Sequence, residues 1–203
     1  MKWSWKRFWI AAGIMIALLA ICGWAVMRDY SNQHVVTKLA KYRGLTVDAE
    51  GKEAEEAVTA AIVAKSKYGR ALETETKKEY ENSMFYFEQE AKYFKMTLDE
   101  YVQKNYAMDE ASFRKKVRDA AEDTVKTNAV LKEIAKREEI TFSDEEFAKT
   151  MPYIMEAYGY TDEEQMAKEV DLISVRDALF LEKVRAYLVE VNTVVNAKTE
   201  PEE

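Results

Sequence analysis

The signals that decide the fold of this 203-residue chain lie in residues 97–138, TLDEYVQKNYAMDEASFRKKVRDAAEDTVKTNAVLKEIAKRE. Thr97 and Glu100 have the spacing of a capping box, in which a hydroxyl and a glutamate satisfy free backbone N–H groups where a helix begins. Further along, apolar side chains recur every three or four residues from Phe113 to Ile134, the period of one helix face. The stretch predicts a short helix followed by a long one.

The same signals recur in the rest of the chain. Two more capping boxes begin at Ser143 and Thr161, and each precedes a segment with helical periodicity. No strand pattern long enough to build a sheet follows residue 48, and the stretch before it is expected to be extended or irregular. The sequence predicts an all-α fold, with helices over 52–68, 72–95, 97–106, 109–138, 143–158, 161–169 and 171–195.

The first thirty residues contain a candidate membrane span. Residues 8–27, FWIAAGIMIALLAICGWAVM, carry no charged side chain, and as a helix they would rise about 30 Å, the thickness of the hydrocarbon core of a bilayer. Trp9 and Trp24 stand near the two ends, where tryptophan favours the membrane interface, and Lys6 and Arg7 precede the span. The positive-inside rule predicts a single-pass signal-anchor with a cytoplasmic N-terminus and an extracytoplasmic domain.

Two other interpretations of this segment stay open. A cleaved signal peptide would have a shorter apolar run, of about 7–15 residues, followed by a small-x-small cleavage site. Cys22 would be the modified residue of a lipoprotein, but bulky Ile21 stands where such sites have a small residue. The length of the run favours the signal-anchor.

Composition divides the chain into four parts. They are an N-terminus with the membrane span (1–29), a juxtamembrane linker (30–48), a helical domain (49–196) and a disordered tail (197–203). Residues 1–29 carry a net charge of +3, so the remainder carries −10, which argues against nucleic acid as a partner. The single cysteine lies inside the predicted span, which excludes a disulfide framework.

No catalytic or metal-binding motif is evident. His34 is the one histidine, and no nucleophile or carboxylate pattern surrounds it. The acidic runs at 144–146 and 162–164 fall in the first turns of predicted helices, where negative charge suits the helix dipole. We therefore expect no enzymatic activity, no metal and no cofactor. An enzyme whose site forms only in the folded chain is one alternative.

Two clusters of bulky side chains exceed what one helix face can hold. Four bulky residues stand in a row at 84–87, and successive helix residues point about 100° apart, so at least two sides of this helix are apolar. A second cluster lies at 151–160. Its methionines and tyrosines suit a surface that accepts many apolar segments, although burial in a core is the competing interpretation. The candidate polypeptide-binding residues are Met84, Phe85, Phe87, Phe94, Met96, Tyr101, Met151, Met155 and Tyr158.

The order of elements from residue 98 onward matches a known family. The turn Ala107-Met108-Asp109-Glu110 follows a short helix, and a long helix, a Ser-Asp-Glu-Glu start and a Tyr-Gly turn come next. The final helix contains VRDALFLEKVRAYLVEVNTVV (175–195). In these features the chain resembles the C-terminal domain of trigger factor, the bacterial ribosome-associated chaperone. KLAKYRGLTV (38–47) is also similar to the segment that leads into that family's isomerase domain.

The resemblance implies an elongated multi-helix domain of the trigger factor C-terminal, SurA-like type. It also implies that the domain holds unfolded, nascent or exported polypeptides without ATP, and a homodimer is possible. The family's ribosome-binding domain is replaced here by the predicted span (8–27), and 47–72 has no room for a prolyl isomerase of about a hundred residues. We therefore expect a membrane-anchored holdase without isomerase activity. The alternative is an adaptor that binds one specific membrane or envelope protein.

Overall fold

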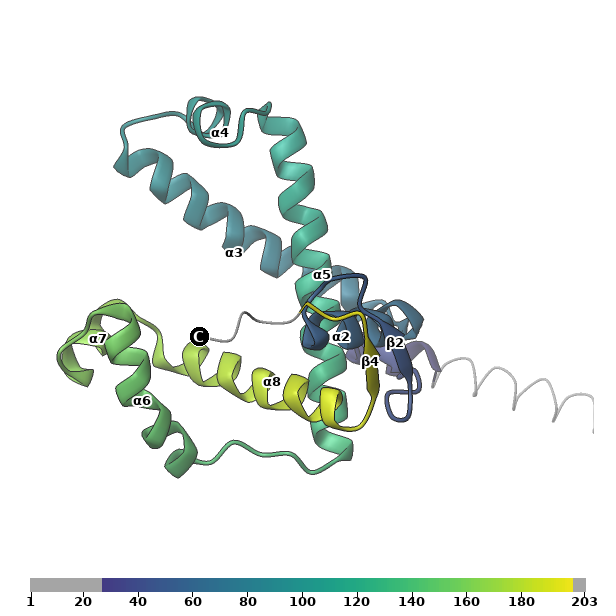
Figure 1. Cartoon of the computed structure of the whole chain (residues 1–203). Helices are drawn as coiled ribbons and strands as arrows, with labels where there is room; N and C mark the ends of the chain where they lie inside the picture. The colour runs from purple at the N-terminus through teal and green to yellow at the C-terminus, as the bar shows by residue number, and fades with distance from the viewer. Residues whose placement is uncertain (1–26, 199–203) are drawn as a thin grey trace, which may run out of the picture. The chain divides into compact units, whose positions relative to one another are not determined.

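The computed structural model describes residues 27–198 (Figure 1). These residues form two compact units, each built from two stretches of the chain. The first unit comprises residues 27–38 and 67–125, and the second comprises 39–66 and 126–198. The chain crosses between the two units three times, and the last crossing lies inside the long helix α5 (Glu110–Arg137), so each unit contains part of that helix.

The described chain is mostly helical, as the sequence predicts. Residues 27–33 form a helical stretch ahead of the first strand. The elements that follow are β1 (Val36–Lys38), β2 (Thr46–Asp48), α2 (Ala54–Lys65), β3 (Lys67–Tyr68), α3 (Ala71–Tyr93), α4 (Leu98–Tyr106), α5 (Glu110–Arg137), α6 (Asp144–Tyr158), α7 (Glu163–Glu169), α8 (Leu172–Glu190) and β4 (Thr193–Val195).

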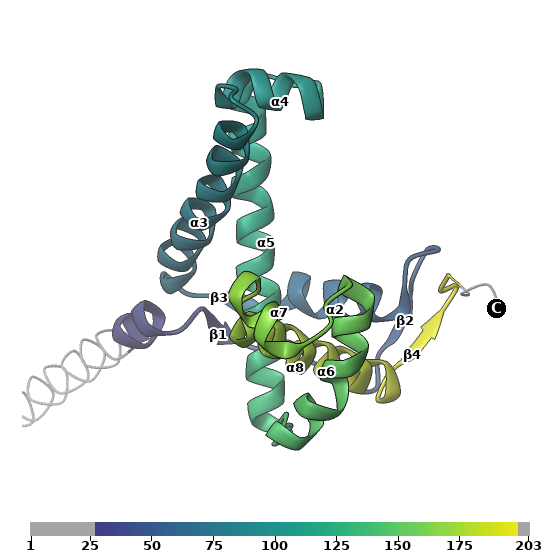
Figure 2. The ribbon, with the colours of Figure 1, turned by 90° about the vertical axis from the view of Figure 1, so that its left-hand side faces the viewer.

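The first unit is a helical hairpin. α3 and the first part of α5 are its two legs, and α4 lies across the end where they are connected (Figures 1 and 2). The buried core of the hairpin consists of Met84, Ala91, Tyr101, Val102, Phe113 and Val117. At the other end of α3, β3 pairs antiparallel with β1, with Tyr68 opposite Val36, and this pairing places the helix 27–33 beside the start of α3.

The second unit packs α2 against α8. Val58 and Ile62 of α2 and Val184 and Leu188 of α8 are completely buried, because these helices have apolar residues at spacings of four. β2 and β4 pair in parallel, with Thr46 opposite Thr193, although 147 residues separate the two partners. α6 and α7 pack against each other ahead of α8.

The capping boxes at Thr97 and Ser143 are confirmed, because in each the hydroxyl accepts from the N3 backbone and the glutamate accepts from the cap. The third box is wrong. The N-cap of α7 is Asp162, whose carboxylate accepts from Gln165 N at 2.7 Å, and the helix begins one residue later than predicted. A carboxylate is a strong cap, and Asp162 competes successfully with the neighbouring Thr161.

The all-α expectation is too simple, since four short strands are present among residues 27–198. The last helix ends at Glu190 rather than at residue 195, and Thr193–Val195 forms a strand. Threonine and valine are β-branched and favour extended backbone when a partner strand is available. That partner, β2, lies near the other end of the domain sequence, so local periodicity could not predict it.

Candidate polypeptide-binding surface

The structure divides the nine candidate binding residues between core and surface. Three are buried, with at most 7% of their surface exposed: Met84, Tyr101 and Met151. Three are half-buried: Phe87, Met96 and Met155. Three have more than half of their surface exposed: Phe85, Phe94 and Tyr158. The folded chain offers only the last two groups to a polypeptide, and binding by any of the nine stays a prediction.

The exposed aromatic side chains of α3 and of its C-cap form what we call the aromatic strip. Its members are Phe85, Tyr86, Tyr93 and Phe94, with exposed fractions of 56%, 70%, 82% and 55%. Tyr86 and Tyr93 are seven residues apart, which is about two helical turns, so they point to the same side. Phe85 contacts the ring of Tyr86, and Tyr93 contacts that of Phe94, with centroids 6.0 and 5.2 Å apart.

The strip faces outward because the opposite side of α3 is needed by the core. Met84 and Ala91 are buried, and Phe87 presents its ring edge to Phe113 with centroids 4.9 Å apart. The run of bulky residues at 84–87 predicts two apolar sides, and the structure assigns one to the core and one to solvent. Tyr86 and Tyr93 were missed as candidates because sequence alone does not say which side is covered.

A groove of about 390 Å³ lies in the same unit, and we call it the hairpin groove. Its lining is mostly apolar and comes from α3, from the end of α4 and the turn after it, and from α5. The apolar residues that line it are Phe87, Tyr106, Met108, Phe113, Val117, Ala120 and Ala121. The groove is wide enough to hold one or two apolar side chains of a bound segment.

The second unit has its own apolar pocket, of about 370 Å³, which we call the α6–α8 pocket. Its apolar lining is Ile154, Tyr158, Met166, Val170, Val175, Ala178 and Leu179. The surrounding sequence, residues 144–182, contains eleven acidic and three basic side chains, a net charge of −8. This unit therefore combines an apolar pocket with a strongly acidic surface that favours solubility.

Tyr101 has a structural role within the first unit. Its hydroxyl donates a hydrogen bond to Glu90 Oε2 at 2.6 Å, and this bond, followed by burial, raises the pKa of Tyr101 to about 12. Its ring stacks on that of Phe94 with centroids 6.3 Å apart. Tyr101 thus holds α4 against α3 and supports one edge of the aromatic strip from behind.

His34 is exposed and lies between the helix 27–33 and β1, as expected for a solvated linker residue. Its ring stacks on Tyr30 at 4.0 Å, and Nδ1 lies 3.1 Å from the backbone oxygen of Tyr30. Within residues 27–198, no three His, Cys, Asp or Glu side chains are grouped so that they could hold a metal ion.

The predicted membrane-anchor residues, Lys6, Arg7, Trp9 and Trp24, lie outside the described residues, as does all but the last residue of the span 8–27. A search of residues 27–198 finds no helix with the length and hydropathy that a transmembrane segment requires.

Comparison with known proteins identifies the family. The family model of the bacterial trigger factor protein C-terminus matches residues 48–190. This chain belongs to the trigger factor C-terminal family. The trigger factor of Clostridium kluyveri is 33% identical over 150 residues, which is 72% of this chain and 34% of that protein. The trigger factor of Carboxydothermus hydrogenoformans is 40% identical over 89 residues, 42% of this chain and 20% of that protein.

A third relative extends the match across most of the chain. The trigger factor of Caldicellulosiruptor saccharolyticus is 25% identical over 183 residues, covering 86% of this chain and 41% of that protein. The chain thus spans about a fifth to two fifths of the length of these curated relatives. No solved structure matches it. The resemblance inferred from the helix order and the turn at 107–110 is confirmed by the family match.

Proposed function

We propose that this trigger factor C-terminal chain is a membrane-anchored, ATP-independent chaperone that holds non-native polypeptides. The observation that carries the proposal is the aromatic strip, in which four large rings of α3 and its C-cap are each exposed over more than half of their surface. Soluble proteins seldom leave such rings together in solvent unless the surface binds something. Membership of a chaperone domain family supports the same conclusion.

In this mechanism the aromatic strip and the two pockets bind different parts of a client polypeptide. Rings on the strip bury apolar segments of a client, which contributes about 25 cal/mol per Å² of apolar surface removed from water. The hairpin groove and the α6–α8 pocket accept single large side chains, each within its own unit. Methionine and tyrosine adapt to clients of different shape, and the acidic residues 144–182 keep a loaded chaperone in solution.

Aggregation of a denatured client tests this function. The fragment 27–203 should suppress aggregation at stoichiometric amounts, and serine at Phe85, Tyr86, Tyr93 and Phe94 should remove most of the suppression. The matched control is serine at Glu75 and Lys78, an exposed ion pair on the same helix at 2.8 Å. Equal suppression by the strip variant and the control would show that the strip does not bind clients. Met84 and Met151 are unsuitable for this test because they are buried.

The adaptor alternative differs from a chaperone in selectivity. Cross-linking from a photoreactive residue at Tyr86 in intact membranes should label many different polypeptides, since the strip has no shape that demands one sequence. Labelling of one dominant folded partner would favour the adaptor.

The proposed location rests on the span 8–27, with Lys2, Lys6 and Arg7 keeping the N-terminus in the cytoplasm. Clients would then be polypeptides that emerge from export across the membrane. Protease added outside spheroplasts should degrade the domain while an N-terminal tag stays protected. Protection of the domain and loss of the tag would reverse the proposed orientation.

A further inference from the structure

The hairpin groove is lined by rows of residues on its two legs. Within each row the residues are four positions apart: Glu79, Ser83 and Phe87 on α3, Phe113, Val117 and Ala121 on α5, and Lys116, Ala120 and Thr124 on α5. The second of these rows is buried and forms the floor, and the third is exposed and forms the α5 rim. Rows of this spacing are the ridges along which helices pack on one another, so the groove has the surface pattern of a helix-packing site.

The dimensions of the groove suit a short helical segment. Each row spans eight residues of helix, a rise of about 12 Å, which is just over two turns. One end is closed by Tyr106 and Met108, and the rings of Tyr106 and Phe113 are in contact, with centroids 5.0 Å apart. Small side chains, of Ser83 and Ala120, stand in the middle of the two outer rows. Because the approach of two helices depends on the side chains between them, a third backbone can come close here.

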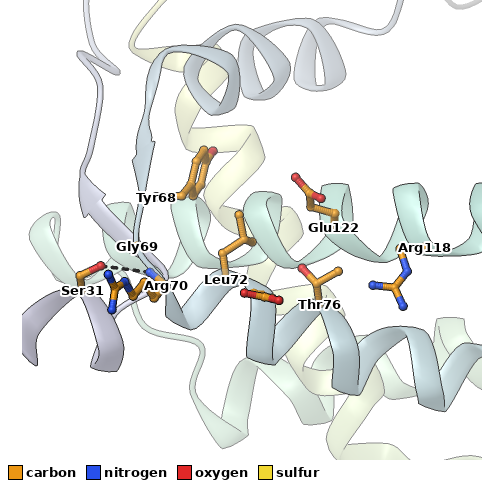
Figure 3. A pocket seen from close by; sticks show the side chains of 9 residues that line it. Ser31, Tyr68, Gly69, Arg70, Leu72, Thr76, Arg118 and Glu122 are labelled. Carbon is orange, nitrogen blue, oxygen red and sulfur yellow. Dashed lines mark hydrogen bonds between the residues drawn. The ribbon is translucent and has the colours of Figure 1, made fainter. Parts of the chain in front are cut away.

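Another side of α5 is polar and closed by contacts with α3. Arg114 donates a hydrogen bond to the hydroxyl of Tyr80 at 3.5 Å, and the guanidinium carbon of Arg118 lies 4.9 Å from the centroid of the same ring. Arg118 and Glu122 also line a separate polar pocket together with Thr76 of α3 (Figure 3). The apolar lining between the legs is therefore concentrated on the groove side of α5.

Two charged side chains stand at ends of the outer rows, Glu79 on α3 and Lys116 on α5. In the described part of the chain, neither forms an ion pair or a side-chain hydrogen bond. The charges are opposite and belong to opposite walls. The groove thus complements an apolar segment that carries a cation on one flank and a carboxylate on the other.

The walls of the groove favour a helix over an extended strand. Both walls are helices, whose backbone N–H and C=O groups bond within the helix, so they offer no edge to which a strand could pair. An extended segment would lose water from its own backbone groups against the apolar lining and gain few partners, which is unfavourable. A helical segment makes these hydrogen bonds internally.

We propose that the hairpin groove binds client segments as amphipathic helices. Two large apolar side chains of the client, four residues apart, are separated by a rise of about 6 Å and enter the groove above Val117 and Ala121. A cation of the client pairs with Glu79, and a carboxylate pairs with Lys116. The client helix completes a three-helix arrangement with α3 and α5. This inference rests on the client-binding part of the proposed function and makes no use of the membrane anchor.

Two fluorescent peptides test the preference for a helix, with the full chain reconstituted in lipid nanodiscs and empty nanodiscs as background. The first has about 14 residues, or four helical turns, with two leucines four residues apart, flanked by one glutamate and one lysine. The second has proline at a central solvent-facing position, which breaks the helix. Fluorescence anisotropy should show at least about tenfold tighter binding of the first peptide. Equal affinities would overturn the proposal.

Filling the groove tests where the helical peptide binds. Ala120 is exposed and lines the groove, so Ala120→Trp should block the approach of the helix and weaken binding about tenfold or more. Ala111→Trp, at another exposed alanine of α5 outside the lining, is the matched control. The melting temperatures of both variants check that the hairpin is folded. Unchanged binding by a folded Ala120→Trp variant would exclude the groove as the site.

A charge reversal tests how the helix is seated. Replacing the glutamate of the peptide by lysine should weaken its binding about two- to fivefold, the range of an exposed ion pair. Lys116→Glu should restore the affinity for this altered peptide. Lys115→Glu, on an exposed neighbour that does not line the groove, should restore nothing. Failure of Lys116→Glu to restore binding would contradict the proposed seating.

The aggregation assay separates this inference from the proposed function. A chain that suppresses aggregation but binds the helical and the proline peptide equally overturns the helical inference alone. A chain that binds the helical peptide selectively but suppresses no aggregation supports the groove as a helix-binding site and counts against the holdase.

Discussion

The hydroxyl of Tyr187 in α8 donates a hydrogen bond to Glu138 Oε2 at 2.6 Å, just beyond the end of α5. The other carboxylate oxygen accepts from the hydroxyl of Tyr42 at 2.7 Å, and Arg43 lies 3.3 Å from both oxygens. One carboxylate thus joins three segments of the second unit. The hydrogen bonds from Tyr187 and Tyr42 hold the pKa of Glu138 below its usual range.

Tyr187→Phe should lower the free energy of unfolding by about 1 kcal/mol, because one hydrogen bond to a carboxylate is lost and the ring still fills its place. Urea unfolding at pH 7 measures the change. Tyr153→Phe is the matched control, since Tyr153 is 74% exposed and should tolerate the change without effect. Equal effects of the two substitutions would show that the bond to Glu138 contributes nothing specific.

Tyr187 should also make the stability of the protein depend on pH at alkaline pH. Burial, followed by the hydrogen bond to Glu138, raises the pKa of Tyr187 to about 12, from 10.0 in the unfolded chain. Its contribution to stability is complete below pH 10 and is lost as the pH rises through 12. Thermal unfolding between pH 9 and 12 should therefore show a smaller decline for Tyr187→Phe than for the unmodified chain.

Protonation of Glu146, at the start of α6, should lower the stability of the fold at acidic pH. The hydrogen bond from Lys183, followed by that from the Ser143 backbone, lowers the pKa of Glu146 from 4.5 to about 2. Its contribution is present above pH 4.5 and is lost as the pH falls toward 2. Glu146→Gln should be less stable at pH 6 and decline less steeply on acidification. Glu145→Gln, an exposed neighbour, is the control, and parallel curves for both variants would contradict this assignment.

Gly69 should be intolerant of any side chain. Alanine there would force apart the backbone of the helix 27–33 and α3, lowering the free energy of unfolding by about 1–3 kcal/mol. Gly51 provides a contrast, because a Cβ there meets nothing within 4 Å but its φ is +80°. Asparagine tolerates that backbone conformation and should be milder than alanine at Gly51, whereas both should be equally harmful at Gly69.

Met84 and Phe85 are adjacent and should respond in opposite ways. Met84 is 4% exposed and lies in the hairpin core, so alanine should cost about 2–5 kcal/mol of stability. Phe85 is 56% exposed, and alanine there should change stability by about 0.5 kcal/mol or less. The two melting temperatures measure this directly. A large loss at Phe85 would place it in the core and weaken the proposed aromatic strip.

Substitutions at the start of α7 test whether Asp162, and not Thr161, is the N-cap of this helix. Asp162→Ala should lower stability by about 1 kcal/mol, because the bond from Gln165 N is lost, whereas Thr161→Ala should have little effect. Hydrogen exchange of the amides in the first turn of α7 reports the difference locally. A larger effect at Thr161 would restore the capping box that the sequence predicts.

The sequence by itself predicted helices α2 to α8 of this protein, though not all of their ends, and it predicted the family. Local signals were sufficient, because caps such as Thr97 and Ser143 act within three residues and the stripe from Phe113 to Ile134 repeats within one helix. The order of these elements also identified the family that the comparison confirms.

Only the tertiary structure decided which apolar side chains are available to a client. Met84 and Tyr86 belong to the same bulky run, yet one is in the core and the other is 70% exposed, since exposure depends on what packs against each side of α3. The pairing of β2 with β4 and the approach of Ser31 to Gly69 likewise join residues far apart in the chain. Such contacts depend on the path of the whole backbone, and no periodicity within one segment encodes them.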